Sequence, residues 1–261
     1  MADRARLDDR ADSANRIVFL GHATVMIELD GVRLLTDPLL RDRVAHLRRQ
    51  GQSLDPAVYE DIDAVLISHL HHDHLDLASL RLLGLGIPLL VPAGAGELPR
   101  RNGFTDVSEL QVGETASVGA VEVTAVEARH DGRRHPGGLR AETIGYFIRG
   151  RHAVYFAGDT ELFDDMSALP SSPDVALLPV AGWGPTLGAG HMDPLDAARA
   201  VRLIQPRIAI PMHWGTLLPI GLAGRHGGRL GDPPRIFAEH VASLAPGVEV
   251  RILQPGQETT I

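Results

Sequence analysis

The chain contains no cysteine among its 261 residues. Disulfide bonds are therefore excluded, and any metal site must be built from histidine, aspartate or glutamate. The 13 histidines are numerous for a chain of this length. Imidazole and carboxylate ligands suit divalent ions such as zinc, iron or manganese. The composition thus permits metal sites made of imidazole and carboxylate ligands and excludes sites made of thiolates.

Long apolar runs and an excess of basic residues are also missing. No run reaches the roughly 20 residues of a membrane span, and the start of the chain is charged and lacks the apolar core of a signal peptide. A net charge of −8 argues against non-specific binding to nucleic acid, which needs a basic surface. We expect a cytoplasmic protein with a small-molecule substrate, a flexible tail over residues 1–15 and one domain over residues 16–261. The sequence does not reveal the oligomeric state.

A cluster of imidazole and carboxylate side chains follows a predicted buried strand. The apolar residues Val65–Ile67 predict the strand, and HLHHDH comes directly after Ser68. A loop at the end of a buried strand is a common place for chemistry. His69 and His71 alternate and can face one ion, and the carboxylate and imidazole that follow can face a second ion. The alternative is a histidine-rich surface loop, which a lone His-x-His would favour.

This motif resembles the HxHxDH signature of the metallo-β-lactamase superfamily. Two further stretches narrow the resemblance: GHAT followed by a hairpin that ends in TDP, and PMHWGT. Both are similar to the branch that includes N-acyl-phosphatidylethanolamine phospholipase D and ascorbate-6-phosphate lactonase. The resemblance implies an α/β fold, a four-layer αββα sandwich with helices outside and the site at one sheet edge.

The resemblance also implies three downstream ligands in the order histidine, aspartate, histidine. His130 follows a predicted strand, Asp159 stands in GDT after another, and His213 follows the last central strand. Two half-sites bridged by Asp159 then comprise His69, His71 and His130 in one, and Asp73, His74 and His213 in the other. For Asp159 the alternative is to cap a helix that starts at Glu161.

The implied cofactors are two divalent ions per chain, with zinc as the first choice and manganese or iron as alternatives. Two ions that share a water lower its pKa toward neutrality, and the hydroxide attacks a carbonyl carbon or a phosphorus. We expect hydrolysis of a phosphodiester or a phosphorylated small molecule. A lactonase and a non-catalytic metal-binding module are the alternatives. Asp73 could also accept a proton, although as a ligand its chief role is structural.

Several other residues are candidates for roles around the metals. His191 resembles a non-ligand histidine of this branch near the substrate, and we expect it to donate a proton to the leaving oxygen; the alternative is an exposed histidine. Asp37 ends a strand and is expected to orient a ligand histidine through its second ring nitrogen. The sequence leaves open whether substrate is contacted by His22, Arg133, Arg134 and Trp183. An arginine pair can clamp a phosphate, or it can simply be solvated.

The hydrophobic pattern predicts an opening hairpin followed by strand–helix units. Strands are expected over residues 25–29 and 32–36, joined by a tight turn at Asp30–Gly31. Residues 41–59 are polar and poorly periodic, and we expect a loop with a short helix that forms a flap beside the site. The chain is expected to end in a strand over residues 248–253.

Overall fold

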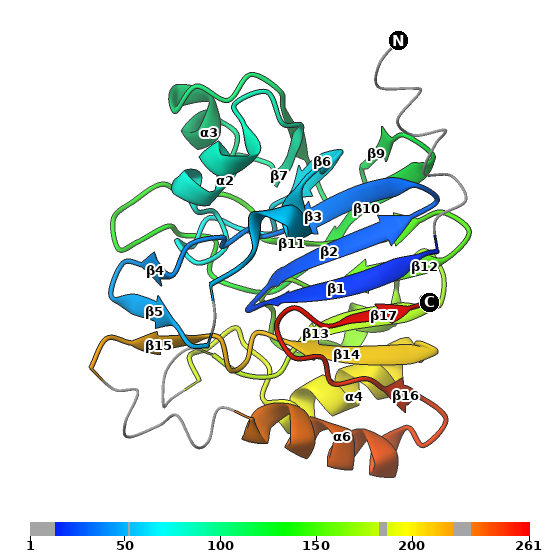
Figure 1. The fold of residues 1–261 in the computed structure, drawn as a ribbon. Helices are drawn as coiled ribbons and strands as arrows, with labels where there is room; N and C mark the ends of the chain where they lie inside the picture. The colour runs from blue at the N-terminus through cyan, green and yellow to red at the C-terminus, as the bar shows by residue number, and fades with distance from the viewer. Residues whose placement is uncertain (1–13, 52, 183–186, 222–230) are drawn as a thin grey trace.

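Two β-sheets packed face to face form the centre of the protein, and helices cover the outer face of each (Figure 1). The computed structural model describes residues 14–51, 53–182, 187–221 and 231–261. Within these ranges, the two large sheets have seven strands each, and a smaller sheet has three. The four-layer αββα sandwich predicted from the sequence is confirmed.

The first sheet combines antiparallel and parallel pairing. In spatial order its strands are β17 (Glu258–Thr260), β1 (Arg16–Gly21), β2 (Thr24–Leu29), β3 (Val32–Thr36), β6 (Ala64–Leu66), β7 (Leu89–Pro92) and β8 (Val107–Leu110). The pairs from β17 to β3 are antiparallel, and those from β3 to β8 are parallel. Helices α2 (Leu77–Leu83) and α3 (Glu97–Arg101) cover its outer face.

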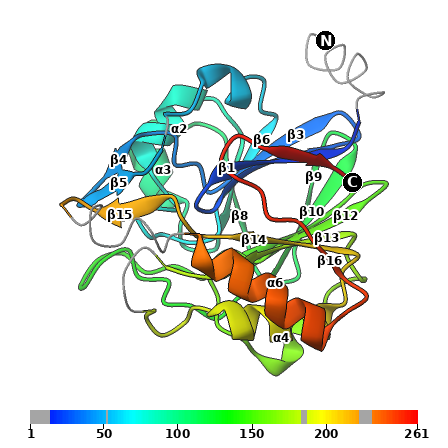
Figure 2. The ribbon, with the colours of Figure 1, turned by 60° about the horizontal axis from the view of Figure 1, so that its bottom comes forward.

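The second sheet has the same mixed character. Its strands are β16 (Glu249–Val250), β14 (Ile208–Met212), β13 (Val175–Pro179), β12 (Ala153–Phe156), β11 (Ile144–Arg149), β10 (Val121–Glu127) and β9 (Thr115–Val118). Helices α4 (Pro194–Ile204) and α6 (Asp232–Leu244) pack against its outer face (Figure 2). Among the described residues, no helix combines the length and apolarity needed to cross a bilayer.

Strand β1 shows why the central strands are apolar on both faces. Ile17 and Phe19 point into the core between the sheets. Val18 and Leu20 point the other way, into the core beneath the helices. Since side chains alternate between the faces of a strand, a sheet covered on both sides requires a continuous apolar run.

The β2–β3 hairpin is confirmed at the predicted turn. Asp30 and Gly31 have φ angles of 50° and 80°, so both central residues are left-handed. This is the pattern of a type I′ turn, whose twist matches that of the flanking strands. The side chain of Asp30 also accepts a hydrogen bond from the backbone N–H of Arg151, 2.7 Å away.

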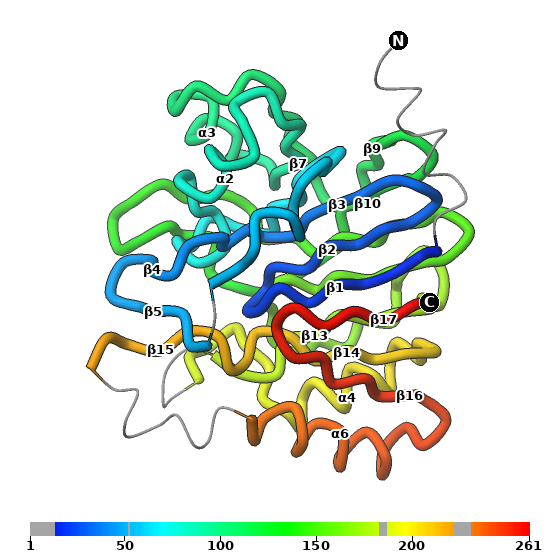
Figure 3. Tube along the Cα trace, viewed as in Figure 1, coloured from blue at the N-terminus to red at the C-terminus, as the bar shows by residue number. Residues whose placement is uncertain are grey.

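The structure differs in part from two expectations about the chain. The short helix expected within residues 41–59 is the 3₁₀ helix η1 (Pro56–Tyr59), but the segment also contains two short strands, β4 (Arg43–Val44) and β5 (Leu47–Arg49). They pair with β15 (Leu217–Pro219) in the small sheet. The expected terminal strand is reduced to β16, and the chain then crosses to the first sheet, where β17 pairs with β1 (Figure 3). Strands of two or three residues are too short to produce a readable alternation.

Candidate metal centre

The predicted site residues lie at one edge of the sandwich. β1, β3 and β6 run in one direction in the first sheet, as do β10, β12 and β14 in the second. The loops that follow these six strands carry His22, Asp37, His69 to His74, His130, Asp159 and His213, in that order. The structure therefore brings together all seven residues that the sequence predicted as ligands.

Three imidazole rings meet in the first half of the centre. Nε2 of His69 lies 2.9 Å from Nδ1 of His71, and Nε2 of His130 lies 3.1 Å from the same atom. All three nitrogens lie within 4.8 Å of one another. This spacing suits three ligands of one cation, since zinc–nitrogen bonds are about 2.0–2.1 Å long.

The second half contains the other predicted group and one additional histidine. Nε2 of His74 lies 3.3 Å from Nε2 of His213 and 3.8 Å from Oδ2 of Asp73. His22, which the sequence left as either a site residue or an exposed one, is only 2% exposed. Its Nε2–H donates a hydrogen bond of 2.9 Å to Oδ2 of Asp73. One oxygen and three nitrogens thus lie within 4.8 Å of one another.

Asp159 lies between the two groups. Its Oδ2 is 3.2 Å from Nε2 of His74 and 3.3 Å from Nε2 of His213. The same carboxylate also groups with His130 and His191 within 4.8 Å. Its other oxygen, Oδ1, is buried and finds no hydrogen-bond partner among the described residues. A buried carboxylate oxygen without a donor is costly unless a cation satisfies it.

The alternative role of Asp159 as a helix cap is wrong. No helix begins at Glu161; the next helical turn is the 3₁₀ helix η2 (Asp164–Ser167).

The glycine before Asp159 explains how the chain brings this residue so close to the first sheet. Gly158 has a φ of +62°, and a Cβ there would lie 2.7 Å from Cβ of Ser68. The turn therefore requires glycine for conformation and for space.

Three histidines of the centre share one arrangement, in which Nδ1–H is donated to a fixed acceptor. The acceptors are the Asp37 carboxylate for His74, the Gly190 carbonyl for His130 and the Ala181 carbonyl for His213, at 2.7, 2.8 and 2.7 Å. When the ring is neutral, the proton on Nδ1 leaves Nε2 with its lone pair directed into the centre. Histidines that bind metals in proteins are held in this way.

Asp37 supports the HLHHDH loop at two points. Besides its bond with His74, its carboxylate accepts hydrogen bonds from the backbone N–H of Ser68 at 2.7 Å and from the Ser68 hydroxyl at 2.6 Å. The same hydroxyl accepts a bond of 2.9 Å from Nδ1–H of His69. The prediction that Asp37 orients a histidine of the cluster is confirmed, and through Ser68 it also fixes a second histidine.

Comparison with known proteins agrees with this geometry. The family model described as the β-lactamase superfamily domain matches residues 32–214, which is more than half of the chain. The chain belongs to this superfamily. The UPF0173 metal-dependent hydrolase of Methanopyrus kandleri is 36% identical over 251 residues, covering 93% of this chain and 98% of its own. A relative with the same description from Rubrobacter xylanophilus is 31% identical, covering 93% and 95%.

Solved structures of other proteins have the same fold as this chain. Igni18, a metallo hydrolase of the archaeon Ignicoccus hospitalis, aligns with a TM-score of 0.73 at 25% identity, covering 95% of this chain and 99% of its own. Together with the family match, this makes the protein a metal-dependent hydrolase of the metallo-β-lactamase fold. Its histidine and aspartate groups are suited to binding metal.

Burial favours the neutral form of several imidazoles of the hydrolase's centre. It lowers the pKa of His69 well below the usual value, that of His130 to about 4 and that of His22 to about 3. Desolvation is the main cause in each case, because it disfavours the charged ring. Metal ligation requires neutral imidazole, so the buried rings are already in the form that binds a cation.

The carboxylates of the hydrolase attract positive charge to the centre. Burial raises the pKa of Asp73 and Asp159, but the neighbouring histidines, His74 above all for Asp73 and His213 for Asp159, outweigh it and hold both well below the usual value. Burial likewise lowers the pKa of His74. The charges of Asp159, Asp73 and Asp37 outweigh burial, so the pKa of His74 lies well above its usual value. A proton on His74 or a bound cation can therefore compensate these charges.

Arg134 supports the HLHHDH loop. Its guanidinium donates to the backbone carbonyls of Leu70 at 2.7 Å and Leu75 at 3.2 Å, on either side of HHDH. Both bonds come from Nη1, and Nη2 lies 3.1 Å from Nδ1 of His72. Of the other residues considered for substrate contact, Arg133 is exposed and Trp183 lies outside the described residues.

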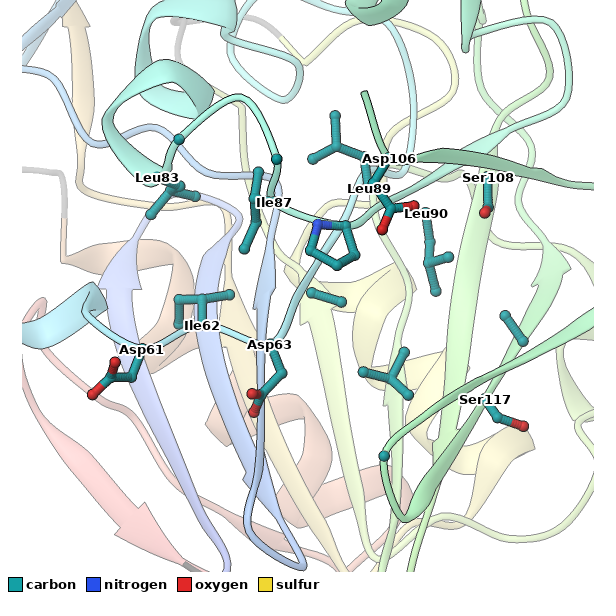
Figure 4. A pocket seen from close by; sticks show the side chains of 17 residues that line it. Asp61, Ile62, Asp63, Leu83, Ile87, Leu89, Leu90, Asp106, Ser108 and Ser117 are labelled. Carbon is teal, nitrogen blue, oxygen red and sulfur yellow. The ribbon is translucent and has the colours of Figure 1, made fainter. Parts of the chain in front are cut away.

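A pocket lies at the opposite edge of the sandwich, far from the candidate metal centre (Figure 4). It has a volume of about 770 Å³ and opens at the amino ends of β6, β7 and β8. Asp61, Asp63 and Asp106 line it together with the apolar side chains of Leu89 and Leu90. Its lining contains no histidine and no basic residue, so it lacks the imidazoles found at the candidate centre.

Proposed function

We propose that the protein is a dinuclear hydrolase of phosphodiesters or phosphorylated small molecules, with zinc as the first choice and manganese or iron as alternatives. The observation that carries this proposal is the pair of donor groups that share Asp159. In this proposal, the first ion is held by His69, His71 and His130, the second by Asp73, His74 and His213, and Asp159 bridges them.

The donor set supports this occupancy on physical grounds. Imidazoles with fixed Nδ1–H groups and two ionised carboxylates are ligands that divalent ions accept. Oδ1 of Asp159, which has no hydrogen-bond partner among the described residues, provides the second ligand oxygen that a bridging carboxylate needs. Bound divalent ions would supply Lewis acidity and a water of lowered pKa. Asp73 is assigned as a ligand more than as a proton acceptor, because one of its oxygens already accepts a bond from His22.

His191 is positioned to serve the leaving group. Its Nε2 lies 3.5 Å from Oδ2 of Asp159, and its ring centroid lies 4.6 Å from that of His130. Nδ1 donates to the carbonyl of Gly188 at 3.1 Å. Burial lowers its pKa, but the hydrogen bond and charge of Asp159, together with the carbonyls of Gly188 and Ala189, outweigh burial, so the pKa is raised overall. A partly exposed imidazole with a raised pKa beside the centre suits a proton donor.

The GHAT, TDP and PMHWGT stretches resemble a branch that contains both a phospholipase and a lactonase, so the choice of phosphate over lactone is tested with a substrate panel. The metal-loaded protein should hydrolyse bis-p-nitrophenyl phosphate and leave simple γ- and δ-lactones intact. Turnover of lactones alone would replace the proposal with a lactonase. Metal binding without turnover of either class would indicate a non-catalytic module.

His191→Ala should retain both metals but turn over substrates slowly. Loss of a general acid typically costs about 10²–10⁴-fold in rate. The deficit should be largest for alkyl leaving groups and should shrink for p-nitrophenolate, which needs little protonation. The measurement is the rate deficit across a series of leaving groups, with metal content determined in parallel. His152→Ala, at the opposite edge, serves as the control. A deficit that is equal for all leaving groups would exclude the acid role.

A further inference from the structure

His22 stands in the second half of the centre without a role in the proposed ligand set. It lies in the turn between β1 and β2 and is 2% exposed. Its φ is +58°, in the left-handed region that residues other than glycine rarely adopt. Such a conformation costs free energy and persists only where the surrounding structure fixes it. The contacts of His22 show what fixes it.

The backbone of His22 is bonded to the loop that follows β14 in the opposite sheet. Its N–H donates to the Thr216 hydroxyl at 2.7 Å. Its carbonyl accepts a hydrogen bond of 2.8 Å from the backbone N–H of His213. The turn of the first sheet and the His213 loop of the second therefore hold each other in register.

The side chain of His22 contacts two residues of the second half-site. Its Nε2–H donates to Oδ2 of Asp73 at 2.9 Å. Its ring lies against that of His213, with centroids 3.9 Å apart and planes tilted by 40°. A carboxylate with one oxygen held by a donor has a fixed direction for the other oxygen, and a ring packed on one face has a restricted rotamer.

We propose that His22 is a positioning residue that prepares the second half-site for its ion. It does so by fixing the carboxylate of Asp73 and the ring of His213 before the ion binds. The inference rests on the proposed dinuclear centre and adds to it a residue that strengthens binding of the second ion. The competing assignment, in which His22 is itself a ligand, gives different results in the following experiment.

The test uses the same amide group at two lengths. His22→Gln places a side-chain N–H as many bonds from Cα as Nε2 of histidine, so it can still reach Asp73. His22→Asn carries the same amide one bond shorter and cannot reach it. Cobalt(II) is added to the metal-free full-length protein and its two variants, and binding is followed by visible absorption and by chelator competition.

A positioning role predicts a specific order of affinities. In His22→Asn, the second ion should bind about 10–100-fold more weakly, as is typical when an outer contact of a metal ligand is lost. The first ion should be unaffected. His22→Gln should recover most of the affinity with an unchanged absorption band. Backbone strain predicts the reverse order, because asparagine tolerates a positive φ better than glutamine does.

Two results would overturn the inference. Equal loss of the second ion in both variants, with a changed cobalt band, would show that His22 is a ligand. Wild-type affinity in both variants would show that it does not affect the site. Binding of fewer than two ions by the wild-type protein would instead overturn the proposed centre. The two failures are distinguishable, because one appears in the variants and the other in the parent protein.

Discussion

Asp159→Asn is expected to fold normally and to lose nearly all hydrolytic activity. The substitution keeps the size of the side chain but removes the charge from a group within 3.3 Å of Nε2 of both His74 and His213. No helix depends on this residue as a cap. Loss of a bridging charge removes several kcal/mol of stabilisation, which corresponds to a decrease in rate of about 10²–10⁴-fold. Turnover of bis-p-nitrophenyl phosphate and the thermal unfolding midpoint are the measurements.

The matched control is Asp174→Asn. Asp174 is also an aspartate beside a histidine, with Oδ2 3.4 Å from Nδ1 of His152, but it lies at the other edge of the second sheet. This variant should keep the parent activity. An Asp159→Asn protein that binds two ions and turns over substrate at the parent rate would contradict the bridging role.

The parts of the site that could be predicted from sequence are those encoded locally. Four of the proposed ligands fall within the six residues HLHHDH after one strand, so spacing alone places them in a single loop. The β2–β3 turn was predictable because Asp-Gly specifies its own conformation. His130 and His213 needed the family resemblance to stand out, since one histidine after a strand is a weak signal.

His22 was not assigned because its environment is made by distant segments. Its burial depends on Thr216 and His213, which are about 190 residues away in sequence, at the end of the other sheet. Arg134 shows the converse. Its position in a polar loop suggested an anion clamp, but the carbonyls it binds become accessible only when the loop folds against the HLHHDH segment. Such tertiary contacts leave no periodic pattern in the chain.

The purified protein is expected to carry close to two divalent ions per chain, and His69→Ala should lose at least one of them. His69 is fully buried, and its Nε2 faces Nδ1 of His71. Removing it takes a ligand from the first group, and the activity should fall by at least about 10²-fold because a water of lowered pKa is no longer supplied. Elemental analysis of protein from metal-replete medium measures the content. His46→Ala, on the exposed segment between β4 and β5, is the control and should bind as the parent does.

The pH dependence of binding provides an independent check on the same centre. The carboxylates around His74 raise its pKa well above the usual value, so in the metal-free protein this ring holds a proton at neutral pH. The ion can bind only after that proton leaves. Affinity should therefore rise with pH over the range in which His74 deprotonates, and binding at neutral pH should release protons, which calorimetry in buffers of different ionisation enthalpy detects. Binding that is independent of pH, or a protein without metal, would contradict the assignment of His74 as a ligand.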